Sequence, residues 1–159
     1  MTEQAELPGL LIRQAREDDI DGIVSVLADD TVGGHGNTTD PAARPGYVAA
    51  FARIAASPSD RLYVAEFDSQ VVGTFQTTLI TVMTRHGRPD MTIEAVHVRA
   101  GMRGKGIGAA MMHFAIEEAR RAGVSLLQLT SNVKRLEAHR FYRRLGFVQS
   151  HAGFKMRLG

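Results

Sequence analysis

The residues best suited to chemistry lie in one stretch, residues 93–112, which reads IEAVHVRAGMRGKGIGAAMM. A strand is expected to end near Arg99, and residues 103–108 (RGKGIG) then open a long helix. The first N–H groups of a helix have no acceptor within the helix, and the helix dipole makes that end positive, so it attracts anions. Glycines let the backbone approach a phosphate closely, and Arg103 and Lys105 add positive charge. The stretch therefore predicts a phosphate or pyrophosphate site.

Two common nucleotide motifs fit this stretch poorly. The spacing Gly104-x-Gly106-x-x-Ala109 matches a dinucleotide fingerprint, but that motif needs a glycine directly after the strand and an acidic residue at the end of the next strand. Here residues 100–102 intervene, and the next expected strand ends in Thr-Ser-Asn, without a carboxylate. The ATP-binding pattern G-x-x-x-x-G-K-[ST] is absent. A glycine-rich helix start without any ligand is the alternative, and the two basic residues among the glycines count against it.

Two motifs resemble those of the GNAT family of N-acetyltransferases. The pattern Arg103-x-x-Gly106-x-Gly108, after a strand containing IEAV, resembles the acetyl-CoA-binding motif of that family. Residues 138–147 (AHRFYRRLGF) resemble its second motif, A-x-x-F-Y-x-x-x-G-F. The motifs occur in the expected order, and the likeness covers residues 9–158. Residues 132–151 are also similar to bacterial aminoalkylphosphonate N-acetyltransferases, a likeness confined to the C-terminal third.

The resemblance implies acetyl-CoA as co-substrate and suggests which residues hold it. The main chain of Val96, His97 and Val98 would bond the pantetheine arm as a neighbouring strand does. Many relatives carry asparagine where this chain has Arg135; Asn132 lies nearby, offset by three residues, and Arg135 would either reach a cofactor phosphate or cap a helix. The amides that would hold the pyrophosphate belong to Arg103, Gly104, Lys105, Gly106, Ile107, Gly108 and Ala109.

Acetyl transfer to an amine needs a free amine, stabilisation of an oxyanion, and a proton for the departing thiolate. Glu94 is the candidate base, because it stands in an otherwise apolar strand just before the cofactor-binding backbone. Its alternative role is a solvated strand carboxylate. The resemblance makes Tyr142 the candidate acid, against the alternative of a core aromatic, and a backbone N–H near Val96 the oxyanion donor.

The six histidines show no metal-ligand spacing, and no required metal is expected. The likeness to aminoalkylphosphonate N-acetyltransferases leaves an assisting divalent ion as the alternative. His97 lies on the strand that carries Glu94, so it would either face the acceptor or be buried and hydrogen-bonded. The chain has no cysteine, which excludes disulfides and a cysteine nucleophile.

A small-molecule primary amine is the expected acceptor, with residues 29–45 and 78–88 framing its pocket. Asp29, Asp30 and Asp40 would attract a cationic amine, and Arg85 and Arg88 an acid, although solvated loop charges are the preferred interpretation of all five. The rival functions are acetylation of a protein lysine or N-terminus, a non-catalytic acyl-CoA sensor, and a nucleic-acid-binding module. The sensor would not need both Glu94 and Tyr142.

The helices and strands that must position these residues are predicted from hydrophobic periodicity and from the glycine and proline residues that end each element. We expect a single mixed α/β domain over residues 1–159, with the GNAT-like fold that the resemblance implies. Its sheet would have six to seven strands and about four flanking helices, and would splay between the fourth and fifth strands. Strands are expected over residues 9–15, 61–67, 70–83, 91–99 and 126–130, with one or two more in 147–158. Helices are expected over residues 17–27, 46–56, 104–122 and 136–145.

Composition narrows the partners of the 159-residue chain. Its 44% hydrophobic and 23% charged residues are typical of a globular protein. The net charge of +2, spread-out arginines and only 6% aromatic residues give no basic stripe or stacking platform, so nucleic acid and membrane are not expected. No signal peptide or membrane span is evident, which favours the cytoplasm. Homodimers are common in the family, but the sequence shows no defined interface.

Overall fold

The structure, a computed structural model, describes residues 7–32 and 35–159. The chain divides into two compact units, Met1–Leu129 and Thr130–Gly159. In the described part of the first unit, five strands form one sheet in the order β1-β2-β3-β4-β5. The strands are β1 (Leu10–Gln14), β2 (Asp60–Phe67), β3 (Gln70–Ile80), β4 (Asp90–Val98) and β5 (Leu126–Leu129), and the α-helices of this unit are α1 (Ile20–Ala28), α2 (Arg44–Ala56) and α3 (Ile107–Arg121). The second unit contains α4 (Leu136–Arg144).

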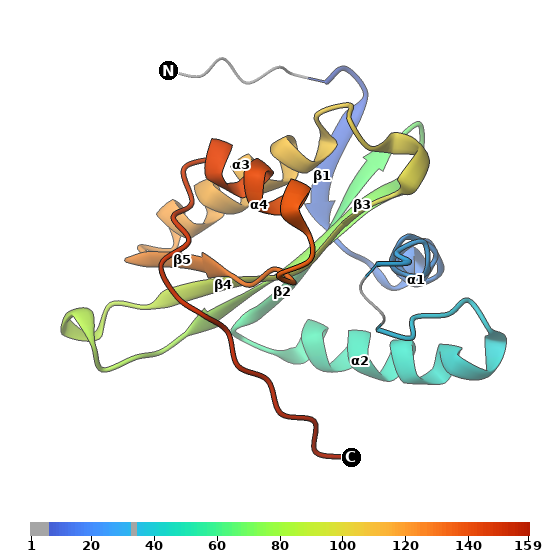
Figure 1. Ribbon diagram of the computed structural model, residues 1–159. Coiled ribbons are helices and arrows are strands. Elements are labelled where there is room, and N and C mark those ends of the chain that lie inside the picture. Colours follow the sequence, from blue (N-terminus) through green and yellow to red (C-terminus); the bar gives the residue numbers. More distant parts are fainter. Residues whose placement is uncertain (1–6, 33–34) are drawn as a thin grey trace. The chain divides into compact units, whose positions relative to one another are not determined.

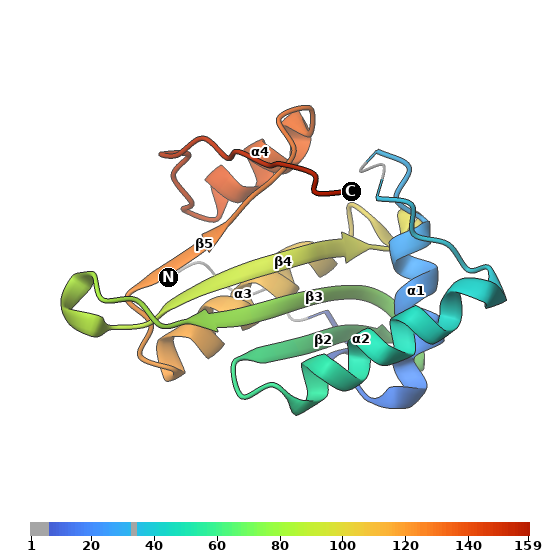
Figure 2. The same cartoon turned by 90° about the horizontal axis from the view of Figure 1, so that it is seen from below.

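The sheet is mixed, as expected. The pairs from β1 to β4 are antiparallel, while β5 runs parallel to β4 after the crossover through α3. Helices α1 and α2 cover one face of the sheet, and α3 covers the other (Figures 1 and 2). Strand β5 pairs with β4 only from Asp90 to Ile93, although β4 continues to Val98. Strand β5 ends at Leu129, opposite Ile93, so in the described residues β4 has no strand neighbour on this side from Glu94 to Val98, where the splay is predicted.

Buried apolar stripes on the helices hold these layers together. On α1, Ile20, Ile23 and Val24 recur at helical spacing and are buried. On the other face, the rings of Tyr63 and Phe75 stack with centroids 4.9 Å apart, and Phe114 of α3 meets Tyr63 edge-on at 5.2 Å.

Glycine at position 73 lets α3 approach the sheet closely. A Cβ built there would lie 2.6 Å from the Met111 sulfur and 3.2 Å from the His97 carbonyl oxygen. Met111 is fully buried, so its side chain has little room to move away.

The predicted strand number is wrong for the described residues, where five strands form. Residues 147–159 form no strand, so the one or two strands expected there are absent. The apolar side chains of Phe154, Met156 and Leu158 are all exposed. A strand forms only where a neighbouring strand accepts and donates its backbone hydrogen bonds, and residues 147–159 have no such ladder.

Two helix starts also differ from the expected ones. Helix α2 begins at Arg44, two residues earlier than expected, because proline is tolerated in the first turn of a helix. Helix α3 begins at Ile107 instead of residue 104, because Gly104 and Gly106 both have positive φ. No helix in the described ranges has the length and apolarity needed to cross a membrane.

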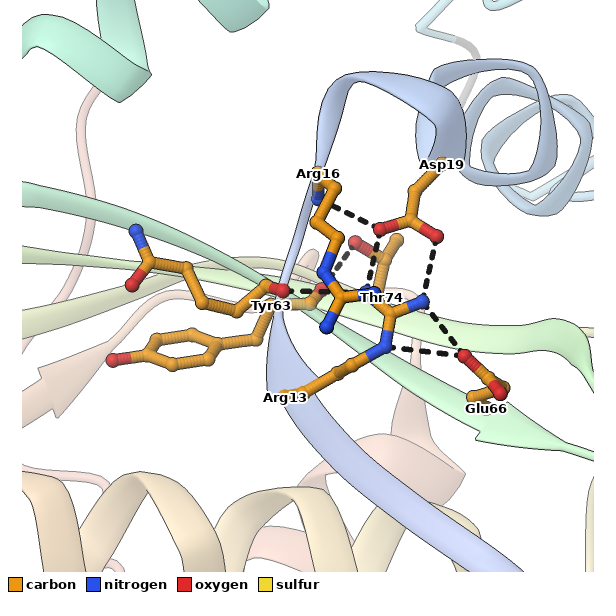
Figure 3. A network of polar contacts seen from close by, with 7 residues as sticks. Arg13, Arg16, Asp19, Tyr63, Glu66 and Thr74 are labelled. Carbon is orange, nitrogen blue, oxygen red and sulfur yellow. Dashed lines mark hydrogen bonds and ion pairs between the residues drawn. The ribbon is translucent and has the colours of Figure 1, made fainter.

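A buried charge network joins β1, β2 and the start of α1 (Figure 3). Arg13 donates to both oxygens of Asp19, at 2.7 and 2.8 Å, and to Glu66 at 2.7 Å. Asp19 also accepts from the Arg16 backbone N–H at 2.7 Å. The hydrogen bonds from Arg13 lower the pKa of Asp19, and its burial opposes this shift.

Replacing Asp19 with Asn should lower the free energy of unfolding by about 2–4 kcal/mol near neutral pH, because Arg13 would lose its closest carboxylate. The lowered pKa means that Asp19 stabilises the fold fully above its unfolded pKa of about 3.9, and that this contribution disappears as pH falls through the folded pKa. The difference between wild type and variant should therefore shrink below about pH 4. Urea unfolding across pH 3–7 measures this difference. Asp21→Asn, which removes an exposed carboxylate paired with Arg44, is the control and should change little.

Candidate active site

The loop between β4 and α3 exposes unpaired backbone donors. Gly104 and Gly106 have φ of +76° and +86°, a region in which glycine carries no steric penalty. Gly106 is the N-cap of α3 and no side chain caps the helix. Among the described residues, no acceptor is found for the N–H groups of Ile107, Gly108 and Ala109, since the first bond into the helix start runs from Ala110 N–H to the Gly106 carbonyl. This geometry suits an anion with several oxygen acceptors.

The two basic side chains of this loop lie on its surface. Arg103 is anchored, because its Nε donates to the carbonyl oxygen of Val98 at 3.1 Å. Lys105 makes only a weak contact with the Met102 sulfur at 3.7 Å. Both side chains are exposed, so a phosphate at the start of α3 could reach them.

Strand β4 carries a bulge just before the loop. Gln76 of β3 faces Glu94 and Thr74 faces His97, so two residues of β4 stand opposite one residue of β3. Ala95, within the bulge, has φ of +51°, which is strained for a residue with a Cβ. Beyond Ile93 the edge of β4 that faces away from β3 has no strand partner. The main chain of residues 96–98, predicted to bind the pantetheine arm, is thus open on that edge.

Glu94 points to the same face of the sheet as Gln76, because residues directly opposite in a ladder share a face. That is the face covered by α1 and α2, since Gln76 lines a cavity together with residues of both helices. Glu94 is exposed, and no described residue forms a hydrogen bond or ion pair with its carboxylate. A carboxylate that is accessible and without a protein partner is able to accept a proton from a ligand.

The cavity between α1, α2 and the sheet has a volume of about 130 Å³. Its wall is mostly apolar and ends at Gln76 and Ala95, the two residues that adjoin Glu94 across and along the sheet. The other lining residues are Ile20, Ile23, Val24, Leu27, Tyr47, Ala50, Phe51, Ile54, Leu62 and Thr74. The sequence did not reveal this cavity, because its wall reads as ordinary core positions of two amphipathic helices.

Two aspartates that follow α1 bind the far end of β4. Asp30 contacts Nε2 of His97 at 3.1 Å, with side chains only 3% and 10% exposed, and the other ring nitrogen contacts the Ala95 carbonyl oxygen at 3.0 Å. Asp29 accepts from the Ala100 N–H at 2.7 Å. The interpretation of Asp29 and Asp30 as solvated loop charges is therefore wrong, because each bonds a residue about 70 positions away in the sequence.

Arg85, Arg88 and Asp40 also have hydrogen-bond partners within the first unit. Arg85 donates to both carboxylate oxygens of Asp90, with its Nε at 3.2 Å from one of them, at the end of β4 opposite to Val98. Arg88 reaches the Gly123 carbonyl at 3.5 Å. Asp40 accepts from the backbone N–H two residues further on, at 2.9 Å. None of these contacts suggests a role in binding an acceptor.

Tyr142, on α4, lies in an aromatic cluster of the second unit. Its ring centroid is 5.1 Å from that of Phe141 and 5.9 Å from that of Phe147. Burial raises the pKa of Tyr142, while the positive charge of Arg135 lowers it by less. The phenol therefore stays protonated at neutral pH, as an acid must.

Asn132 and Arg135 shape the turn that leads into α4. The Asn132 side chain accepts from the Lys134 N–H at 2.9 Å, and its carbonyl accepts from the Arg135 N–H at 2.9 Å. His139 of α4 contacts the same carbonyl at 2.9 Å. Arg135 is the N-cap residue of α4. Cofactor binding by Asn132 and Arg135 stays a prediction.

The structure thus brings part of the predicted site together within the first unit. Glu94 and the open edge of residues 96–98 are continuous along β4 with the loop that starts α3. Tyr142, Asn132 and Arg135 belong to the second unit, and their part in the site stays a prediction. Within residues 7–32 and 35–159, no group of three or more acidic or histidine side chains is arranged to hold a metal ion.

Comparisons with known proteins place the chain among acetyltransferases. The model of the acetyltransferase (GNAT) family matches residues 12–147. An aminoalkylphosphonate N-acetyltransferase of Salmonella typhimurium is 48% identical over 62 residues, which are 39% of this chain and only 40% of that protein. The match therefore spans well under half of that relative's length.

Two solved structures have the same fold over almost their whole length. A transcriptional regulator from Bacillus halodurans has 38% sequence identity and a TM-score of 0.90, with 94% of this chain and 99% of that chain covered. A glucosamine-6-phosphate N-acetyltransferase from Arabidopsis thaliana has 19% identity and a TM-score of 0.78, with 94% and 99% covered, and at that identity it supports the fold alone.

Proposed function

Because the chain belongs to the acetyltransferase (GNAT) family, we propose that it transfers the acetyl group of acetyl-CoA to a primary amine of a small molecule. The observation that carries this proposal is the continuity, along one strand, of an accessible carboxylate at Glu94, an unpaired backbone edge and the uncapped start of α3. Both units would act as one domain, since the family match spans residues of each.

Acetyl-CoA would bind along the end of β4 and the loop that follows. The main chain of Val96, His97 and Val98 would bond the pantetheine arm, and the free N–H groups that begin α3 would hold the pyrophosphate. The exposed side chains of Arg103 and Lys105 would add charge at the same end. Acetyl-CoA is the co-substrate of the family, and no metal is needed for these contacts.

The reaction would proceed by direct attack. Glu94, through water or directly, takes a proton from the ammonium form of the acceptor, and the amine then attacks the thioester carbonyl carbon. A backbone N–H near Val96 stabilises the oxyanion. The C–S bond breaks and Tyr142 protonates the thiolate. The nitrogen gives its second proton, through water, to the Tyr142 phenolate as the amide forms, and Glu94 releases its proton to solvent. Free CoA and the N-acetyl product result.

The cavity beside Glu94 indicates what kind of amine would fit. A cavity of about 150 Å³ lined by Leu, Ile and Phe is large enough to bind benzene, and the cavity here is of similar size at about 130 Å³. None of the described residues that line it is charged. An amine with a compact apolar group would therefore place this group between α1 and α2 and its nitrogen near Glu94. An aminoalkylphosphonate, the substrate named for the Salmonella relative, would place its anion elsewhere.

The test is thiol release from acetyl-CoA with a panel of acceptors: benzylamine and isoamylamine, 2-aminoethylphosphonate, and lysine-containing peptides. Release that depends on one of the small amines supports the proposal. Release only with peptides favours protein acetylation. No release, with acetyl-CoA still raising Tm, favours a non-catalytic sensor, as the regulator name of the Bacillus halodurans relative would suggest. No change in Tm contradicts acetyl-CoA binding itself.

A larger side chain in the cavity between α1, α2 and the sheet should slow the acetylation of an amine that carries an apolar group. Ala50 lines the cavity from α2, so Ala50→Leu should lower kcat/KM for the apolar amine about 10-fold or more, since overpacking displaces either the ligand or the wall. The KM for acetyl-CoA should stay unchanged. Ala49→Leu, at an exposed position of the same helix, is the matched control. Equal effects of both substitutions would mean that the cavity does not bind the acceptor.

A further inference from the structure

The strained backbone at Ala95 needs a cause within the structure. A left-handed conformation in a residue with a Cβ persists only when its surroundings hold it. Inside an antiparallel ladder, a bulge leaves one residue unpaired and re-aims the groups beside it. Here those groups are Glu94, the proposed base, and the Val96 N–H, the proposed oxyanion donor, which lie on either side of Ala95.

One side chain contacts the bulge residue itself. Nδ1 of His97 lies 3.0 Å from the Ala95 carbonyl oxygen, and Nε2 lies 3.1 Å from Oδ2 of Asp30. Both partners are oxygen acceptors on opposite sides of the ring, so the two contacts together fix its orientation. The two contacts lie in a place where the His97 and Asp30 side chains are only 10% and 3% exposed, so water competes little with them.

The same two contacts tie the bulge to α1. Asp30 comes two residues after the end of α1, and its neighbour Asp29 accepts from the Ala100 N–H at 2.7 Å. The last turn of α1 is fixed to the loop as well, because Ser25 accepts from Arg99 at 3.1 Å. These hydrogen bonds thus fix the bulge, the end of α1 and the start of the loop between β4 and α3 relative to one another.

We propose that His97, held by Asp30, is a positioning residue that fixes the bulge at Ala95 and so aims the Val96 N–H at the developing oxyanion. The proposal rests on the proposed function. His97 would not exchange protons with the substrate, because both ring nitrogens are engaged and the side chain is nearly buried. Its effect would be on the chemical step, through geometry, and only weakly on binding of acetyl-CoA.

Two substitutions separate the contacts of the ring. The amide nitrogen of asparagine can take the position of Nδ1, so His97→Asn can keep the bond to the Ala95 carbonyl and lose the one to Asp30. The longer glutamine can place its amide near the position of Nε2, so His97→Gln can keep Asp30 and lose Ala95. We expect His97→Gln to lower kcat at least about 10-fold, with the KM for acetyl-CoA changed less than about threefold. His97→Asn should lower kcat less than His97→Gln does, because it keeps the bond to the Ala95 carbonyl.

Thermal unfolding and amide hydrogen exchange complete the test. Both variants lose one buried hydrogen bond and should lose similar amounts of Tm. Exchange of the amides of residues 94–98 should become faster in His97→Gln only, a readout that does not need activity. Equal loss of kcat in both variants, or unchanged exchange in His97→Gln, would overturn the positioning role. A wild-type protein without turnover would contradict the proposed function instead, and the exchange measurement would still decide whether His97 holds the bulge.

Discussion

Replacing Glu94 with Gln should lower kcat/KM for the amine by about 10²–10⁴-fold, the usual contribution of a positioned general base. The substitution keeps the size and polarity of the side chain but removes its ability to accept a proton. Because the carboxylate is exposed and has no hydrogen bond to a described residue, the loss should not disturb the fold. Steady-state thiol release with the acceptor that supports turnover measures the change, and Tm should stay within the error of wild type.

The pH dependence of the reaction distinguishes a base from a binding residue. If Glu94 takes the proton, the pH–rate profile of Glu94→Gln should lose a limb that the wild type shows, while a residue that only binds the cationic amine would change KM and leave the profile in place. Glu117→Gln removes an exposed carboxylate from α3, where Glu117 pairs with Arg120, and controls for the change of net charge. A Glu94→Gln variant with more than half of the wild-type kcat/KM would contradict the assignment.

Local spacing was enough to predict a loop with free backbone donors at the start of α3, where we propose that phosphate binds. Glycine alternates with two basic residues and an isoleucine at the junction of a strand and a helix, and this pattern needs no information from the rest of the chain. The structure has two glycines of positive φ there and an uncapped helix start. The burial of α1 and the splay of β4 from β5 could also be predicted, since both follow from patterns within single elements or from the family likeness.

Features that depend on long-range contacts could not be predicted. Asp30 and His97 are 67 positions apart, and each has a common local interpretation, a loop charge and a strand histidine. The bulge at Ala95 could not be predicted from the sequence either. A glycine there would have suggested a positive φ, but an alanine does not. The failed prediction of strands in residues 147–158 has the same origin. Alternating apolar residues describe a strand that would be half-buried, but only a pairing partner makes one.

The contacts of Asp29 and Asp30 also change how the acceptor pocket should be understood. The Asp29 and Asp30 carboxylates already bond the Ala100 N–H and the His97 ring. We therefore do not expect either carboxylate to attract a cationic amine. The accessible carboxylate on the α1 and α2 face of β4 is then Glu94, beside a cavity whose wall is apolar. Recognition of the acceptor would rest on shape and apolar contact, with charge acting at the reacting nitrogen.

Gly106 should be the position of the loop that tolerates substitution least. Its φ of +86° is strained for any residue with a Cβ and severely so for a β-branched one, and it is the N-cap from which α3 starts. Gly106→Val should therefore move the first N–H groups of α3 out of alignment and raise the KM for acetyl-CoA by about 10–100-fold, because a pyrophosphate held by several amides depends on their common direction.

Gly101→Ala is the matched control in the same loop. Gly101 lacks a positive φ, and a Cβ there would meet nothing within 4 Å, so the KM for acetyl-CoA should stay close to that of wild type. Titration of each variant with acetyl-CoA, followed by Tm, separates loss of binding from loss of fold. If Gly106→Val kept wild-type affinity, the start of α3 would not be the pyrophosphate site. If it bound weakly but retained the wild-type Tm without ligand, the anion site would be assigned to the amides that follow Gly106.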